Sequence, residues 1–119
     1  LQTGSVDVPV QGVRIAQMAE FTMQMVNKSV ESYVNRDLVL AQEVIESDDT
    51  LDEMFLEVRR TLNANEMHFS ADQILDLLMI AKYYERIGDH ATNIAEWVEF
   101  SLTGRHRDGE EVYDVFGLD

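Results

Sequence analysis

The sequence predicts an all-α protein, an up-down-up antiparallel bundle of three helices. Apolar residues recur at steps of three and four through three long segments, which is the helical period. No stretch of useful length alternates apolar and polar residues, so no sheet is expected. One proline and six glycines in 119 residues leave the segments uninterrupted. Short polar breaks between long helices favour antiparallel neighbours, and helices of this length span roughly 40–50 Å.

The first helix is expected over residues 11–33. Pro9 lies just ahead of it, at a position where a helix tolerates proline. Its apolar stripe comprises Ile15, Met18, Ala19, Met25, Val26, Val30 and Tyr33.

The second helix is expected over residues 37–65. Asn35 or Asp37 can cap its start, and Asn63 and Asn65 mark its end. Its apolar stripe comprises Leu38, Ala41, Val44, Ile45, Leu51, Phe55, Val58 and Leu62.

The third helix is expected over residues 71–103. Ser70 is a favourable N-cap, Asp72 suits the positive end of the helix dipole, and Gly104 stands where a C-terminal glycine belongs. Gly88 lies inside the helix at a cost of up to about 1 kcal/mol relative to Ala, so close helix packing is expected there. The stripe comprises Ile74, Leu77, Ile80, Ala81, Tyr84, Ile87, Ala91, Ile94, Ala95, Val98 and Leu102.

The chain divides into a three-helix domain at residues 11–104 and two different ends. Residues 1–10 are expected to be a linker or a truncated end, since there is no initiator Met and no signal-peptide pattern. Residues 105–119 form a tail too apolar to be purely disordered. The sequence leaves two alternatives for this tail. It can dock on the bundle or on a neighbouring molecule, or it can be a loose terminus.

Composition excludes several classes of function. A net charge of −14 should repel both nucleic acid and anionic lipid surfaces. The longest wholly apolar run, Leu77 to Ala81, is far too short to insert into a membrane. The absence of cysteine excludes disulfides and thiolate metal sites and fits a reducing compartment. An acidic domain of this kind suits cations and basic protein partners.

Four carboxylates have a spacing that points to chemistry. Asp48 and Asp52 are four residues apart on the second helix, as are Glu85 and Asp89 on the third, so each pair faces one way. Asn93 continues the strip. At 100° per residue, Glu85 and Asp89 fall about 120–160° from their apolar stripe, whereas Asp48 and Asp52 fall about 40–80° from theirs. Antiparallel helices can therefore bring both pairs to one exposed acidic shelf, defined here as Asp48, Asp52, Glu85 and Asp89.

Carboxylates brought together repel one another, and a divalent or trivalent cation relieves that repulsion. Oxygen-only ligands favour hard ions such as Mg²⁺, Mn²⁺, Ca²⁺ or ferric iron. The alternative is a plain solvated face, because a like-charge pair four residues apart costs only about a few tenths of a kcal/mol. Spacing alone therefore makes the shelf a candidate metal site.

Motifs of the common enzyme classes are missing. The sequence has no HExxH motif, G-x-S-x-G elbow or glycine-rich phosphate loop. A ferritin-like di-iron site needs Glu-x-x-His on two helices, but His90 is five residues after Glu85 and the second helix has no histidine. We therefore expect that the protein is not an enzyme. A carboxylate-bridged metalloenzyme is the weakest alternative, because an exposed shelf does not enclose a substrate.

The stretch ERIGDHATNIAE, residues 85–96, resembles the signature on the third helix of each PhoU repeat. The stretch DLVLAQEVIESDDTLDEM, residues 37–54, resembles the second helix of that family, and the likeness covers residues 11–104. The resemblance implies one PhoU repeat, whereas family members usually carry two in tandem. It also implies multinuclear binding of iron, zinc or other metals such as manganese or magnesium through a Glu/Asp-x-x-x-Asp motif. The matching positions are Asp48, Asp52, Glu85 and Asp89, with Asn93 as a weaker candidate.

The resemblance further implies negative regulation of phosphate uptake and of the phosphate-starvation response. The expected partners are a phosphate ABC transporter and a sensor histidine kinase, and the expected location is cytoplasmic, peripheral to the inner membrane through these partners. A single repeat fits half of a longer protein, a regulatory piece of a different protein, or a homo-oligomer that rebuilds six helices. The alternative function is a metal-free helical interaction module whose acidic strip binds a basic surface.

Overall fold

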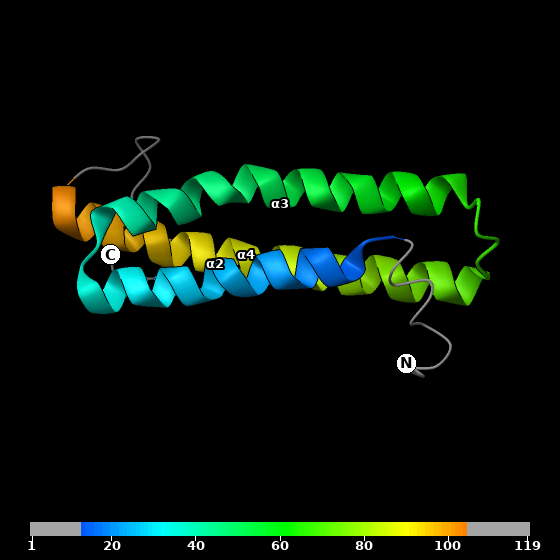
Figure 1. The fold of residues 1–119 in the computed structure, drawn as a ribbon, viewed down its shortest axis with the longest axis horizontal. Coiled ribbons are helices and arrows are strands. Elements are labelled where there is room, and N and C mark those ends of the chain that lie inside the picture. The colour runs from blue at the N-terminus through cyan, green and yellow to red at the C-terminus, as the bar shows by residue number, and fades with distance from the viewer. Residues whose placement is uncertain (1–12, 105–119) are drawn as a thin grey trace.

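The computed structural model describes residues 13–104, which form three long helices lying side by side (Figure 1). These are α2 (Ile15–Asn35), α3 (Leu38–Ala64) and α4 (Ala71–Thr103). α2 and α4 run in one direction and α3 in the other (Figure 1), in a bundle of 51 × 24 × 20 Å. The described part of the chain has no strand, so the predicted all-α, up-down-up fold is confirmed. The predictions for Pro9, the linker and the tail concern residues outside the described range.

Local signals fix the turn between α2 and α3. Asn35 is the last residue of α2, and Arg36 adopts the left-handed conformation at φ 51°. Asp37 is the N-cap of α3, with its carboxylate accepting a hydrogen bond from the Leu40 N–H at 3.0 Å. Of the two capping residues considered from the sequence, Asp37 is therefore the one that caps α3.

The turn between α3 and α4 and the end of α4 also follow the predicted signals. Asn65 ends α3 at φ 48°, and its side chain accepts from the Phe69 N–H at 2.8 Å. Ser70 and Gln73 form a capping box in which each side chain bonds the other's backbone N–H. Gly104 closes α4 at φ 73°, a conformation that favours glycine.

The predicted stripe of α2 is wrong at its C-terminal end. Val30 and Tyr33 are 51% and 66% exposed, while three hydroxyl residues of α2 are fully buried. Each of these hydroxyls donates to a carbonyl of its own helix, so burial leaves no polar atom unpaired. The bonds are Thr22 to Met18 O at 2.9 Å, Ser29 to Val26 O at 2.8 Å, and Ser32 to Ser29 O at 2.7 Å.

Gly88 is a point of close contact between α4 and α3. A Cβ atom placed on Gly88 would lie 2.1 Å from Cδ2 of the buried Leu51. A methyl group at Gly88 would require the Leu51 side chain to move, which confirms the expected close helix packing. Leu51 and Gly88 lie within the acidic stretches of α3 and α4, so this contact positions the shelf.

Candidate functional site: an acidic shelf between two helices

The antiparallel register of α3 and α4 brings the four predicted carboxylates together in two facing pairs. Asp48 of α3 lies within hydrogen-bonding reach of Asp89 of α4. One turn further along, Asp52 lies within reach of Glu85. The shelf predicted from the spacing therefore exists, and its carboxylates lie at the edge of the bundle rather than in its core.

Burial and mutual repulsion raise the pKa of three of these carboxyl groups. Partial burial, the charge of Asp48 and a hydrogen bond with Glu85 raise the pKa of Asp52 to about 6. Burial and then the charge of Asp89 raise the pKa of Asp48. Burial also raises the pKa of Asp89, helped by the charges of Glu85 and Asp52. A proton held by Asp48 or Asp52 can thus be shared with the carboxylate that faces it.

Thr92 is a member of the site that the spacing argument missed. Its buried hydroxyl lies 3.0 Å from the Gly88 carbonyl oxygen and 3.3 Å from Oδ1 of Asp48. The hydrogen bond to Asp48 opposes the other effects and lowers the pKa of that carboxyl. Thr92 lies three residues after Asp89 on the same helix, so helical spacing contained a signal for it.

Lys82 is a second residue that sequence reasoning missed. Its Nζ lies 2.8 Å from Oε1 of Glu85, and 5.1 Å from the centre of the Phe55 ring. Its charge also lowers the pKa of Asp89. Arg86, considered from the sequence as a partner for nearby acids, makes no ion pair with any residue in the range 13–104. The position of Lys82 three residues before Glu85 could have indicated the pairing.

Asn93 has a weaker place in the site. It is partly buried on α4, and the described residues give it no hydrogen bond to a shelf carboxylate. In the register that pairs Asp48 with Asp89, the position opposite Asn93 falls about one turn before Asp48, close to the apolar Val44. Asn93 therefore has no carboxylate facing it from α3 and stays a prediction.

The donor set fits a hard cation in its chemistry. All of the predicted side chains offer oxygen, and carboxylates of two helices face each other as bridging ligands would. Within residues 13–104, no three Asp, Glu or His side chains surround a common point as a metal centre requires. The shelf is thus two facing pairs, and a bound ion would require these side chains to turn toward it.

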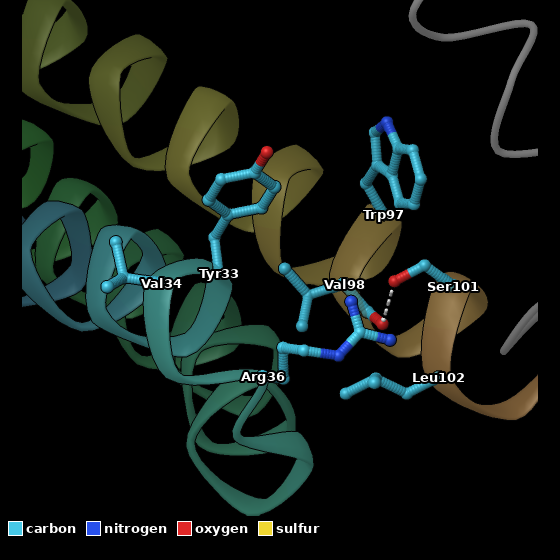
Figure 2. A pocket seen from close by; sticks show the side chains of 7 residues that line it. All are labelled: Tyr33, Val34, Arg36, Trp97, Val98, Ser101 and Leu102. Carbon is cyan, nitrogen blue, oxygen red and sulfur yellow. Dashed lines mark hydrogen bonds between the residues drawn. The ribbon is translucent and has the colours of Figure 1, made fainter.

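A separate groove lies at the end of the bundle where α2 turns into α3 (Figure 2). Its volume is about 530 Å³, and none of the shelf carboxylates lines it. Figure 2 shows the Tyr33 and Trp97 rings on either side of the groove and the Arg36 guanidinium between α2 and α4. The groove is therefore more apolar than the shelf and carries a single cationic side chain. Its lining residues are Tyr33, Val34, Arg36, Trp97, Val98, Ser101 and Leu102.

Fold and site together define a three-helix domain with paired carboxylates on its second and third helices. The model of the PhoU domain family matches residues 15–98, and the chain belongs to this family. This confirms the resemblance found in the stretches of α3 and α4.

Curated relatives share the family name. A "phosphate-specific transport system accessory protein PhoU homolog" of Zymomonas mobilis is 40% identical over 90 residues, covering 74% of this chain and 38% of the relative. One from Xylella fastidiosa is 38% identical over 96 residues, covering 79% and 41%. One from a Burkholderia species is 31% identical over 117 residues, covering 93% and 49%.

The chain spans less than half the length of these relatives, which limits what their names say about it. The search of solved structures found no significant match. None of the helices in residues 13–104 is both long and apolar enough to cross a membrane.

Proposed function

We propose that this domain is a metal-binding regulatory unit of a phosphate-transport accessory protein and acts through protein–protein contacts. The observation that carries the proposal is the pairing of Asp48 with Asp89 and of Asp52 with Glu85 across α3 and α4. Four carboxylates gathered on one edge repel each other, and partial burial followed by this repulsion raises the pKa of three of them. A bound cation would neutralise the shelf and fasten the two helices together.

The residues proposed to hold metal are the four shelf carboxylates, with Asn93 at the margin. Iron, zinc, manganese and magnesium are the candidates, and bridging carboxylates would suit a multinuclear cluster. When bound, the metal supplies positive charge to a surface that otherwise repels anions and attracts basic groups. The chain's own contribution is to hold the carboxylates at the edge of a rigid α3–α4 contact.

The proposed partners follow from the names of the relatives, which are accessory proteins of a phosphate-specific transport system. We propose that the domain contacts components of a phosphate ABC transporter at the cytoplasmic face of the inner membrane. From there it would act with a sensor histidine kinase to lower phosphate uptake and starvation signalling. A second three-helix unit, from a repeat or from another copy of the chain, is the proposed neighbour in the assembly.

Two other functions remain as competitors. In a metal-free interaction module, the ionised shelf itself would bind a basic partner surface, and binding would weaken with salt but survive a chelator. A metalloenzyme would need a pocket that encloses substrate beside the carboxylates. The shelf lies on the edge of the bundle, and the relatives' names describe accessory proteins, so catalysis is the least supported of the three.

The test is metal analysis of the purified chain after reconstitution with each candidate ion and removal of the excess. The Asp48→Asn/Asp89→Asn variant removes one facing pair. The matched control, Asp72→Asn/Asp76→Asn, removes two exposed carboxylates that are four residues apart on α4. In the register that pairs Asp48 with Asp89, the α3 residues opposite them are Asn65 and Thr61, which are not acidic. We expect metal in the wild type and the control but not in the shelf variant. Equal metal in all three proteins would refute the metal site.

A further inference from the structure

The acidic shelf already contains a cation from the chain itself. The ammonium group of Lys82 is 2.8 Å from the Glu85 carboxylate, and it sits 5.1 Å from the centre of the Phe55 ring. Phe55 follows Asp52 by three residues on α3, so the ammonium bridges from one helix to the other at the Glu85 end of the shelf. Within residues 13–104, no other Lys or Arg forms an ion pair with a shelf carboxylate.

The burial of the two partners is unequal. The Glu85 side chain is only 15% exposed, whereas that of Lys82 is 60% exposed. Glu85 is therefore held in place by the packing of α4 against α3, while Lys82 reaches it from the solvent side. An ion pair with one such exposed member is weak, because water solvates the ammonium almost as well as the carboxylate does. Lys82 is thus a counter-cation that can leave without breaking the core.

Lys82 and a bound metal ion would compete for the same carboxylate, that of Glu85. Glu85 faces Asp52, and the Lys82 charge also acts on Asp89, so the ammonium affects both facing pairs. A metal bound between these carboxylates would be repelled by an ammonium beside Glu85 and would need the oxygen that the ammonium occupies.

We infer that Lys82 is a built-in counter-cation that occupies the Glu85 end of the acidic shelf, and that a metal ion must displace it from Glu85 to bind. This inference rests on the metal-binding function proposed above. Lys82 then lowers the affinity of the shelf for metal and keeps its carboxylates partly neutralised when metal is scarce. The residue is a positioning and regulatory group that sets the metal concentration at which the shelf fills.

The first experiment compares Mn²⁺ binding by calorimetry in the full chain, in Lys82→Met and in Lys28→Met. Lys28 is a matched control because it pairs with Glu43 between α2 and α3 and touches no shelf carboxylate. Both variants lose one positive charge, so a general charge effect would appear in both. We expect Lys82→Met to bind Mn²⁺ about three- to fivefold more tightly than wild type, with Lys28→Met within about twofold, because losing one largely exposed ion pair changes a free energy by up to about 1 kcal/mol.

The second experiment follows displacement directly. The ε-methylene protons of Lys82 lie near the Phe55 ring, and their NMR signal is assigned by its disappearance in Lys82→Met. Titration with Mg²⁺ should move this signal toward the position of a free lysine as the ammonium leaves Glu85 and the ring. The Lys28 signal should stay in place.

The outcomes separate the inference from the proposed function. Metal binding in the wild type with equal or weaker binding in Lys82→Met would overturn the inference and leave the metal site intact, because Lys82 would then only orient Glu85. Tighter binding in Lys82→Met together with movement of the Lys82 signal supports it. An absence of Mn²⁺ binding in all three proteins would remove the proposed function and the inference with it.

Discussion

Gly88 of α4 lies so close to Leu51 of α3 that a Cβ atom on the glycine would come within 2.1 Å of the leucine Cδ2. The two residues lie inside the acidic stretches: Leu51 directly precedes Asp52, and Gly88 directly precedes Asp89. The distance between the helix backbones at this point therefore sets the distance between the facing carboxylates. A contact in the core thus controls the geometry of a site on the edge.

Gly88→Ala should destabilise the bundle. Alanine improves intrinsic helix stability by up to about 1 kcal/mol, but overpacking against a buried leucine typically costs about 1–3 kcal/mol. We expect a net loss of up to about 2 kcal/mol in the free energy of unfolding, measured by urea denaturation. In a double-mutant cycle, Leu51→Ala should reduce the cost of the added methyl, since it removes the atom that the methyl meets. A Gly88→Ala variant more stable than wild type would contradict the close contact.

The stability of the metal-free chain should fall as the pH rises through the pKa of Asp52. That pKa is raised from 3.8 to about 6 in the folded state, because Asp52 is partly buried, lies near the charges of Asp48 and Asp49 on its own helix, and faces Glu85 of α4. The folded state therefore holds its proton more tightly than the unfolded state over this interval, so the stabilisation is complete at low pH and is lost toward neutral pH. Lys82 is paired with Glu85, which faces Asp52, and the pKa of Asp52 is raised with this cation in place.

Asp52→Asn should remove this dependence. Urea midpoints in the presence of chelator, measured between about pH 4.5 and pH 7.5, should fall less steeply in the variant than in wild type. The comparison uses the difference between the two proteins, so carboxylates outside the shelf cancel. Asp76→Asn, an exposed substitution on α4, serves as the control and should run parallel to wild type. Parallel curves for Asp52→Asn as well would show that Asp52 titrates normally.

Ser70→Ala should lower stability without affecting the shelf. Ser70 and Gln73 form a complete capping box at the start of α4, with hydrogen bonds of 3.1 Å and 2.9 Å. Replacing an N-cap serine by alanine costs about 0.5–2 kcal/mol, whereas glycine costs only a few tenths. Thermal unfolding should therefore rank wild type and Ser70→Gly close together, with Ser70→Ala below both. Metal content per folded protein should be the same in all three, which separates stability from the site.

Local signals made the helix ends predictable. Asp37, Ser70 and Gly104 act through bonds and backbone conformations within a few residues of themselves, so the sequence contains the whole interaction. The spacing of the shelf carboxylates was predictable for the same reason, since residues four apart on a helix share a face.

Interactions between helices were less predictable. The partners of Asp48 and Asp52 depend on the axial position of α3 relative to α4. No property of one helix alone specifies that register. For this reason sequence analysis missed two contacts between the helices: the Lys82 ammonium over the Phe55 ring, and the hydrogen bond from Thr92 to Asp48.

The wrong prediction for the C-terminal end of the apolar stripe of α2 has a different cause. A hydroxyl that donates to its own helix is satisfied and small, so it can lie in the core although a hydropathy pattern counts it as polar. Thr22 and Ser29 occupy the buried face in this way, and the larger apolar Val30 and Tyr33 are turned to the outside.

Thr92→Val should make Asp48 harder to ionise. The Thr92 hydroxyl lies 3.3 Å from Asp48 Oδ1, and this bond lowers the pKa of a carboxyl that burial and Asp89 raise. Valine keeps the shape of threonine but cannot donate, so the pKa of Asp48 should rise above its wild-type value. Carboxyl-detected NMR titration of the metal-free chain measures this directly. Thr92→Ser keeps the hydroxyl and should titrate like wild type, and a shift in both variants would point to altered packing around Gly88. Because protons and metal compete for the ionised carboxylate, Thr92→Val should also bind Mn²⁺ more weakly than wild type at acidic pH, and the deficit should shrink as the pH rises and Asp48 ionises in both proteins.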